Sequence, residues 1–236
     1  MPGTDVEDAA GRPAPSRTRI ASPAIAGVLV AVVCLGAYVE LAEDLRISPR
    51  VYEFDTQLTG LIEAWRTPWL TGFFRAITWS ASSVPVALVA VAAVAVLLWL
   101  ARQREALFVA LVAGVGTLLG TLAKQVTARP RPPVASALVE LPTSFSFPSG
   151  HTLAAVLLWS VVVLAVWRTT TRTWLRWIAA AVGLSLAVLT GMSRVYLGLH
   201  WPSDVLASWL LGIAWLALCL GGFSAWERAA GPPACR

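Results

Sequence analysis

Charged residues are scarce in this chain of 236 residues. Asp, Glu, Lys and Arg make up 13% of it, whereas soluble domains carry roughly 25%. Hydrophobic residues make up 57%, and the mean hydropathy is +0.71. This composition argues against a soluble single-core protein, a disordered chain, a coiled coil and a nucleic-acid-binding domain. The net charge of +5 is then explained more simply by arginines in the loops of a membrane protein than by an acidic partner.

Cysteine, histidine and lysine are also rare. The three cysteines are Cys34, Cys219 and Cys235. They show no metal-binding spacing, their odd number gives no disulfide framework, and two of them lie in apolar runs where they are expected to pack. The chain has only two histidines, His151 and His200, and one lysine, Lys124. Any chemistry that needs histidine must therefore use these two positions.

Six windows of the sequence contain no Lys, Arg, Asp or Glu. They are Ile20–Val39, Ala76–Ala101, Ala106–Ala123, Thr152–Trp167, Trp177–Ser193 and Val205–Trp226. Each reaches or nearly reaches the roughly 17–25 apolar residues of a membrane-spanning helix. Because backbone groups in the bilayer core must be hydrogen-bonded within their own segment, the windows predict six transmembrane helices. The first window is longer than the core of a signal peptide, about 7–15 residues, and is predicted to be a retained helix. The second exceeds one span, and its membrane part is expected at about Val84–Leu100.

Two sets of apolar residues recur at helical spacing between the first two spans. They are Leu58, Leu61, Ile62 and Trp65, followed by Trp69, Phe73, Ala76 and Ile77. They predict short amphipathic helices at the membrane surface, although packing against the bundle away from lipid is an equally good interpretation. The expected fold class is therefore all-α: a polytopic membrane helix bundle with six transmembrane helices and short interfacial helices between the first two. Residues 1–19 are predicted to be a disordered cytoplasmic tail, 20–226 the membrane domain and 227–236 a second cytoplasmic tail.

The distribution of charge predicts the orientation of the bundle. With the N-terminus in the cytoplasm, the short links at 102–104 and 168–176 lie inside and are basic, as the positive-inside rule requires. The stretch 40–63 then lies outside and is rich in acids. These acids are Glu40, Glu43, Asp44, Glu53, Asp55 and Glu63. This topology brings three polar segments together at the outer face.

The three segments hold most of the chemically reactive side chains of the chain. They are 124–132, with Lys124, Arg129 and Arg131; 148–151, with Ser149, Gly150 and His151; and 193–204, with Arg194, His200 and Asp204. Taken singly, each residue has a simpler role: the cations as interfacial anchors, Ser149 as a helix cap beside His151, and Asp204 as a first-turn acid. Charges near the bilayer are costly, however, and both histidines lie beside arginines at one depth, which favours a functional site.

This combination of residues suits phosphoryl transfer. Arginine and lysine clamp phosphate oxygens, and a helix opened by Ser149 and Gly150 offers backbone N–H groups to an anion. One histidine can attack phosphorus while the other protonates the leaving oxygen. Asp204 lies four residues after His200 and can fix the tautomer of its ring. The same cations oppose a bound dication, so no metal is expected.

The three segments resemble the signature of the type 2 phosphatidic acid phosphatase superfamily, the lipid phosphate phosphatases. The family motifs are Lys-x6-Arg-Pro, Pro-Ser-Gly-His and Ser-Arg-x5-His-x3-Asp, and all their letters are present here. The resemblance implies that His200 is the nucleophile that forms a phosphohistidine, that Asp204 orients it, and that His151 is the acid and later the base. It further implies phosphate binding by Lys124, Arg131, Ser149, Gly150 and Arg194, with no metal and no other cofactor. Arg129 is not a motif residue and is left as an auxiliary contact.

By this resemblance the chain is expected to be a metal-independent hydrolase of lipid phosphates or diphosphates, active at the extracytoplasmic face of the cell membrane. Candidate substrates are an isoprenoid carrier diphosphate such as undecaprenyl diphosphate, phosphatidylglycerol phosphate and phosphatidic acid. An outward-facing site in an Ala- and Arg-rich chain fits a bacterial cell envelope and slightly favours the carrier lipid. The expected partners are the substrate and the bilayer, with no nucleic acid, and the sequence predicts no oligomeric state.

Two alternatives remain open at this point. The first is an enzyme similar to the vanadium haloperoxidases, against which the six spans argue. The second is a membrane protein that binds or transports lipid phosphates without catalysis, which would have no need of both histidines.

Overall fold

The computed structural model describes residues 23–229, and every regular element in this range is helical. The elements are α1 (Pro23–Ile47), α2 (Pro49–Glu63), α3 (Pro68–Ser80), α4 (Ser83–Trp99), α5 (Gln103–Ala110), η1 (Leu111–Val115), α6 (Gly116–Thr127), η2 (Val134–Ser136), α7 (Gly150–Thr169), α8 (Thr173–Tyr196) and α9 (Pro202–Ala229). Of these, η1 is a π-helical turn and η2 a 3-10 turn. The predicted tail at 1–19 and residues 230–236 lie outside the described residues.

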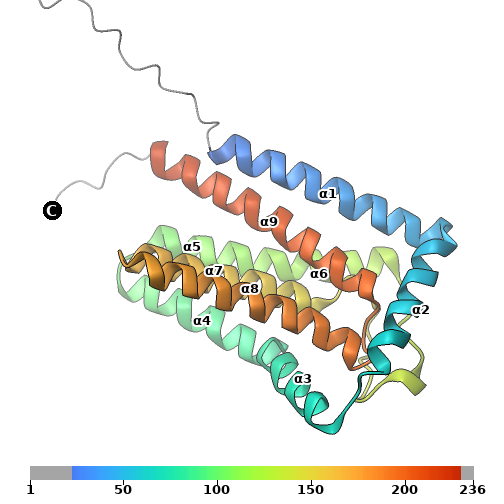
Figure 1. Ribbon diagram of the computed structural model, residues 1–236. Coiled ribbons are helices and arrows are strands. Elements are labelled where there is room, and N and C mark those ends of the chain that lie inside the picture. The colour runs from blue at the N-terminus through green and yellow to red at the C-terminus, as the bar shows by residue number, and fades with distance from the viewer. Residues whose placement is uncertain (1–22, 230–236) are drawn as a thin grey trace, which may run out of the picture.

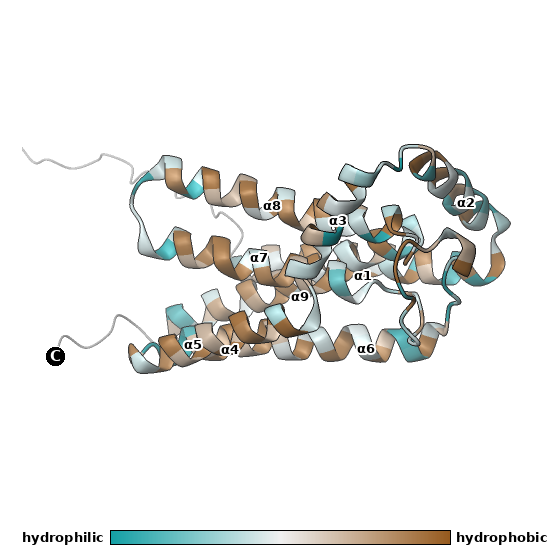
Figure 2. Cartoon of the chain, turned by 90° about the horizontal axis from the view of Figure 1, so that it is seen from below, coloured by the Kyte–Doolittle hydropathy of each residue, from teal (hydrophilic) through white to brown (hydrophobic). Residues whose placement is uncertain are grey.

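The long helices are membrane spans by length and composition. In the described part of the chain, α1, α7, α8 and α9 each qualify, and so does the continuous run of α5, η1 and α6 at Gln103–Thr127. Helices α3 and α4 qualify as a pair bent by 40°, and the pair counted as one gives six spans. Figure 2 shows hydrophobic residues along the helix shafts and hydrophilic residues mainly near their ends and in the links. The predicted all-α membrane bundle is therefore confirmed.

Helices α1 and α9 lie side by side, and the start of α1 and the end of α9 are at the same end of the bundle (Figure 1). Two glycines allow this close approach. A Cβ on Gly27 would collide with the Ala217 carbonyl oxygen, and one on Gly221 would crowd the backbone of Ala24. Small residues at such a crossing let two membrane helices gain dispersion contacts that lipid does not provide.

Helices α2 and α3 lie at the opposite end of the bundle (Figure 1). Both begin at a proline, Pro49 and Pro68, whose fixed φ suits the first helical position. Trp65 lies just after the end of α2, although the sequence pattern placed it on the helix. On the inner side, Ile62 packs against the cluster around Tyr196, whereas Trp69 is 71% exposed. These helices therefore have one face packed on the bundle and one exposed apolar face, as the interfacial prediction requires.

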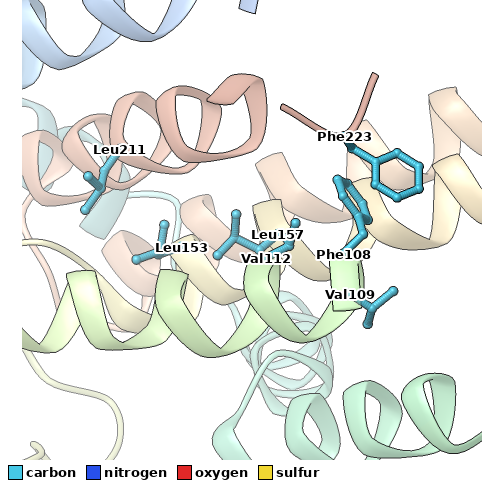
Figure 3. Packing of buried hydrophobic residues seen from close by; sticks show 7 residues of the cluster. All are labelled: Phe108, Val109, Val112, Leu153, Leu157, Leu211 and Phe223. Atoms are coloured by element: carbon cyan, nitrogen blue, oxygen red, sulfur yellow. The ribbon is translucent and has the colours of Figure 1, made fainter. Parts of the chain in front are cut away.

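The apolar core holds α5–α6, α7 and α9 together. Figure 3 shows Phe108 beside Phe223, and Leu153 and Leu157 of α7 facing the same layer. The ring centroids of Phe108 and Phe223 are 5.0 Å apart. At the π-helical turn, the indole Nε1 of Trp215 donates to the carbonyl of Val112 at 3.2 Å. These contacts set the position of α6, which carries Lys124, relative to the start of α7.

Candidate active site

Three segments that are distant in the sequence meet at the end of the bundle that carries α2 (Figure 1). Lys124, near the end of α6, donates from Nζ to the carbonyl of Phe145 at 2.7 Å. The backbone N–H of Ser149, just before α7, donates to the carbonyl of Asp204 in α9 at 3.3 Å. One cluster contains the residues that the motifs predict: Lys124, Arg131, Ser149, Gly150, His151, Arg194, His200 and Asp204.

A glycine shapes the link between α8 and α9. Gly198 has a φ of +72°, in the left-handed region, and a Cβ there would collide with the carbonyl oxygen of Ser136. Leu197 and Leu199 on either side are buried, so the link folds inward rather than into solvent. His200 follows directly and is only 2% exposed.

His200, two residues before α9, and Asp204, in the first turn of α9, form a buried pair. His200 Nδ1 lies 3.3 Å from Asp204 Oδ2. The same carboxylate oxygen accepts the backbone N–H of Trp201 at 3.0 Å and the hydroxyl of Ser146 in a short hydrogen bond. Asp204 is 0% exposed, so its orientation is fixed by these donors rather than by water.

The other ring nitrogen of His200 faces an arginine. Arg131 Nη1 lies 3.1 Å from His200 Nε2 and donates to the carbonyl of Leu199 at 2.7 Å. Its Nε donates to the carbonyl of Ser144 at 2.8 Å. A guanidinium nitrogen can only donate, so Nε2 must be an acceptor and the ring proton lies on Nδ1, facing Asp204. This network assigns the tautomer in which the Nε2 lone pair points into the cationic cluster.

Burial lowers the pKa of both His200 and Arg131. Desolvation lowers the pKa of His200 to about 3, and the hydrogen bond and charge of Asp204 only partly oppose it. Burial also lowers the pKa of Arg131, while Asp204 again acts in the opposite direction. An arginine nevertheless stays protonated at physiological pH, and His200 stays neutral there. The site at rest is thus a neutral imidazole among fixed positive charges.

Arg194 brings a second guanidinium to the cluster. It is 4% exposed, and its Nη1 donates to Thr78 Oγ1 at 2.8 Å. Its Nε is buried and has no hydrogen-bond partner within residues 23–229. A buried donor without a partner costs about 1–3 kcal/mol, so this N–H is available for an anion. His151 is half-buried on α7, and the charges of Lys124, Arg131 and Arg194 act on its ring.

The start of α7 also suits an anion. Ser149 Oγ accepts the hydroxyl of Thr152 at 2.9 Å, and within the described range this side chain makes no capping bond to the helix. The first N–H groups of α7 therefore keep their capacity to donate, in the positive field of the helix N-terminus. Lys124 Cε lies 3.8 Å from where a Cβ on Gly150 would be, so the ammonium stem passes over this glycine.

The structure adds three residues that the motifs do not contain. Arg129, expected only as an auxiliary contact, donates to Asp204 Oδ1 at 2.6 Å from Nη1 and to Asp55 Oδ2 at 2.6 Å from Nη2. Asp55 in α2 is 0% exposed, and Ser146 touches both His200 and Asp204. The sequence offered no signal for Ser146, and it showed Asp55 only as one of several acids outside the spans.

The arrangement has a definite chemical character. An uncharged nucleophilic nitrogen lies beside arginine and lysine groups, a helix N-terminus and a second histidine. Positive groups of this kind bind the oxygens of a phosphoryl group and stabilise the charge that develops on them.

Comparison with known proteins agrees with this character. Residues 105–228 match the PAP2 superfamily. An undecaprenyl-diphosphatase of Sulfolobus acidocaldarius is 39% identical over 107 residues, which are 44% of this chain and 47% of that protein. A phosphatidylglycerophosphatase B of Bacillus subtilis is 33% identical over 161 residues, covering 66% of this chain and 76% of that protein. The alignment thus spans about half the length of the archaeal relative and three quarters of the bacterial one.

A solved structure extends the similarity to most of the bundle. The crystal structure of a transmembrane PAP2-type phosphatidylglycerolphosphate phosphatase from Bacillus subtilis matches with a TM-score of 0.77 at 28% identity. The match covers 84% of this chain and 98% of that one. With the family match over more than half of its length and an apolar bundle of the same fold, this chain is a multi-pass membrane protein that belongs to the PAP2 superfamily.

Proposed function

We propose that this protein is a membrane phosphatase that hydrolyses a lipid phosphate or diphosphate through a phosphohistidine on His200. The observation that supports this most strongly is the geometry of that ring. Asp204 holds Nδ1–H, and Nε2 presents its lone pair to a site lined by Arg131. The names of the relatives, an undecaprenyl-diphosphatase and a phosphatidylglycerophosphatase, support a lipid phosphate as the substrate class.

In the first step, His200 Nε2 attacks phosphorus and the P–O bond to the lipid breaks. Lys124, Arg131 and Arg194 donate to the non-bridging oxygens, and Arg131 exchanges Nε2 for one of these oxygens as the phosphoryl group enters. His151 protonates the leaving oxygen, so the lipid departs as an alcohol or as a lipid monophosphate. Asp204 stabilises the positive charge that forms on the His200 ring.

In the second step, water displaces the histidine. His151, now without its proton, removes a proton from water, and the water oxygen attacks phosphorus while the P–N bond breaks. Inorganic phosphate leaves, and His200 returns to its neutral form. Every proton is moved by a side chain and every charge is balanced by a cation of the chain, so the cycle needs no metal.

We further propose that both termini are cytoplasmic and that the site opens at the extracytoplasmic face. The described ends of α1 and α9 share one end of the bundle, together with the basic links at 102–104 and 168–176 (Figure 1). Catalytic residues lie at the other end. The head groups of the bilayer lipids lie at this depth. The bent pair α3–α4 lies beside the site, where Thr78 of α3 accepts from Arg194.

The test is phosphate release by the purified protein in detergent. The panel holds undecaprenyl diphosphate, phosphatidylglycerol phosphate and phosphatidic acid, each with and without EDTA. We expect release from at least one lipid, unchanged by EDTA, inhibited by vanadate and abolished in His200→Ala. Arg172→Ala, at the other end of the bundle, serves as the control and should match the wild type. Release that required added Mg²⁺, or bromide oxidation in the presence of vanadate and peroxide without phosphate release, would contradict the proposal.

A further inference from the structure

Asp55 of α2 is a fully buried acid that is hydrogen-bonded to the first turn of α9. Asp55 Oδ1 accepts the backbone N–H of Ser203 at 2.9 Å, and Oδ2 accepts the Ser203 hydroxyl at 2.6 Å. Asp55 Oδ2 also lies 2.6 Å from Arg129 Nη2, and the two side chains are 0% and 10% exposed. The neighbour of Ser203 on this turn is Asp204, the residue that holds the histidine ring.

Arg129 connects the two carboxylates. One arm of its guanidinium binds Asp55, and the other binds Asp204 Oδ1 at 2.6 Å and Ser203 Oγ at 2.7 Å. Its carbon Cζ lies 5.6 Å from the ring centre of Trp201, so the plane of the group is also held from one side. The contacts form a continuous chain from Asp55 through Arg129 and Asp204 to His200.

The charges along this chain explain why two acids are present. When Nε2 attacks phosphorus, the His200 ring becomes a cation and needs a negative partner. Arg129 alone would cancel the charge of Asp204, and the ring would then face a neutral ion pair. Asp55 restores one net negative charge to the group while Arg129 keeps its position. In a buried site such a charge is weakly screened, so its effect reaches across several ångströms.

Stability alone does not account for the arrangement. Burying ionised groups is costly, and well-packed apolar residues commonly stabilise a fold as well as a buried ion pair does. Two buried acids on one arginine, placed against a catalytic pair, therefore call for a role in the reaction.

We infer that Asp55 is a positioning residue that acts through Arg129 and Asp204: it supplies the negative charge that Arg129 removes from the His200–Asp204 pair. This inference rests on the proposed phosphatase function. It predicts that the loss of the Asp55 charge slows turnover without weakening substrate binding, because the cations that bind phosphate are untouched.

The first test is Asp55→Asn, measured as kcat and KM on the best lipid of the panel. Asparagine keeps the size and one acceptor for Ser203 N–H but has no charge. We expect kcat to fall about 10- to 100-fold, the size of effect that the loss of an outer hydrogen-bond partner has on metal-binding histidines, with KM unchanged or lower. Glu53→Gln removes an exposed charge from the same helix and is the matched control, with kcat as in the wild type.

The double variant Asp55→Asn/Arg129→Gln separates charge from scaffolding. It removes one negative and one positive charge, so Asp204 again carries a net negative charge beside the ring. We expect it to turn over faster than Asp55→Asn, although it lacks more native contacts. A double variant as slow as the single one or slower would overturn the inference, as would an Asp55→Asn enzyme with wild-type kcat.

Folding is monitored by thermal unfolding and size exclusion in detergent. If Asp55→Asn does not fold, the double variant still decides, because it leaves no arginine charge facing a neutral amide and its glutamine can still donate to Asp204 Oδ1. Its kcat within about 30-fold of the wild type supports the inference, and a larger loss in folded protein refutes it. A wild-type protein that released no phosphate from any lipid would instead refute the proposed function.

Discussion

Replacement of Asp204 by asparagine is the most informative single change, because the two oxygens of this carboxylate do different work. Oδ2 accepts from Trp201 N, His200 Nδ1 and the Ser146 hydroxyl, and Oδ1 accepts from Arg129. In every one of these contacts the partner is the hydrogen-bond donor and Asp204 is the acceptor. An amide has one oxygen and one NH₂ group, so asparagine cannot satisfy both sides.

Each orientation of the amide has its own consequence. With the oxygen in the place of Oδ2, the NH₂ group faces Arg129 Nη1, where the native contact is 2.6 Å, and two donors repel each other. This orientation destabilises the fold by about 1–3 kcal/mol but keeps the tautomer of His200. With the oxygen toward Arg129, the NH₂ group faces Nδ1, which must then accept. The ring proton moves to Nε2, and the nucleophile is lost.

Both orientations also remove the charge that stabilises the cationic ring. We expect kcat for lipid phosphate to fall in Asp204→Asn by up to about 10⁴-fold, the loss that the same change causes in a Ser-His-Asp enzyme. The assay is phosphate release at saturating substrate, with the folded fraction measured by thermal unfolding. Glu140→Gln, an exposed acid in the loop before α7, is the control for the loss of a charge on this side. A kcat within tenfold of the wild type would refute the assignment of Asp204 as the partner of His200.

Three further predictions use the same structure. His200→Ala should give no covalent phosphoenzyme after an alkaline quench. His151→Ala should still give some labelled phosphoenzyme from an activated aryl phosphate, but its turnover of a lipid monoester should fall at least about 10²-fold. If His200→Ala kept the label and His151→Ala lost it, the two roles would be reversed. Reporter fusions at Arg104 and Arg172 should read as cytoplasmic and one at Glu140 as external, and a cytoplasmic signal at Glu140 would overturn the topology. The pKa of His200 is lowered to about 3 in the folded protein, so below the unfolded pKa near 6.5 the unfolded chain binds a proton that the folded chain does not. The stability that this neutral ring contributes is therefore present above about pH 6.5 and is lost as the pH falls towards 3. Between pH 7 and 5 the wild type should therefore lose about 2 kcal/mol more of its free energy of unfolding than His200→Gln does, and equal losses in both proteins would contradict burial of a neutral ring.

The fold could be predicted from the sequence wherever the bilayer restricts which backbone structures and residues are allowed. Long windows without charge coincide with the helical runs, because backbone groups in lipid have no partner outside their own helix. The boundary between α3 and α4 was anticipated, since the membrane part expected at about Val84–Leu100 begins one residue after α4 does, but the 40° bend itself was not. The second window, Ala76–Ala101, begins within α3 and shows no break at the bend, since Ser80 to Ser83 are small and uncharged. Trp65 was placed on a helix by its spacing alone, whereas Pro68 just beyond it, at the start of α3, ends that pattern.

The residues of the site fall into two groups, those whose convergence could be predicted from the sequence and those whose convergence could not. Lys124, Arg131, His151 and His200 are rare or charged residues at helix ends or in the links just beyond them. Helix ends of one membrane depth meet in any bundle of this kind, so their convergence followed from topology. Asp55 is different, because its partners Arg129 and Ser203 are 74 and 148 residues away in the sequence. Nothing local distinguishes it from Glu53, two positions earlier on the same helix, which is exposed. Two positions apart on a helix, the two acids point to opposite sides, and the packing of α2 against α9 buries Asp55 beside Ser203 and leaves Glu53 exposed. The proposed catalytic pair, His200 and Asp204, therefore lies within one motif, whereas the acid proposed to balance its charge is buried by the packing of a helix outside all three motifs.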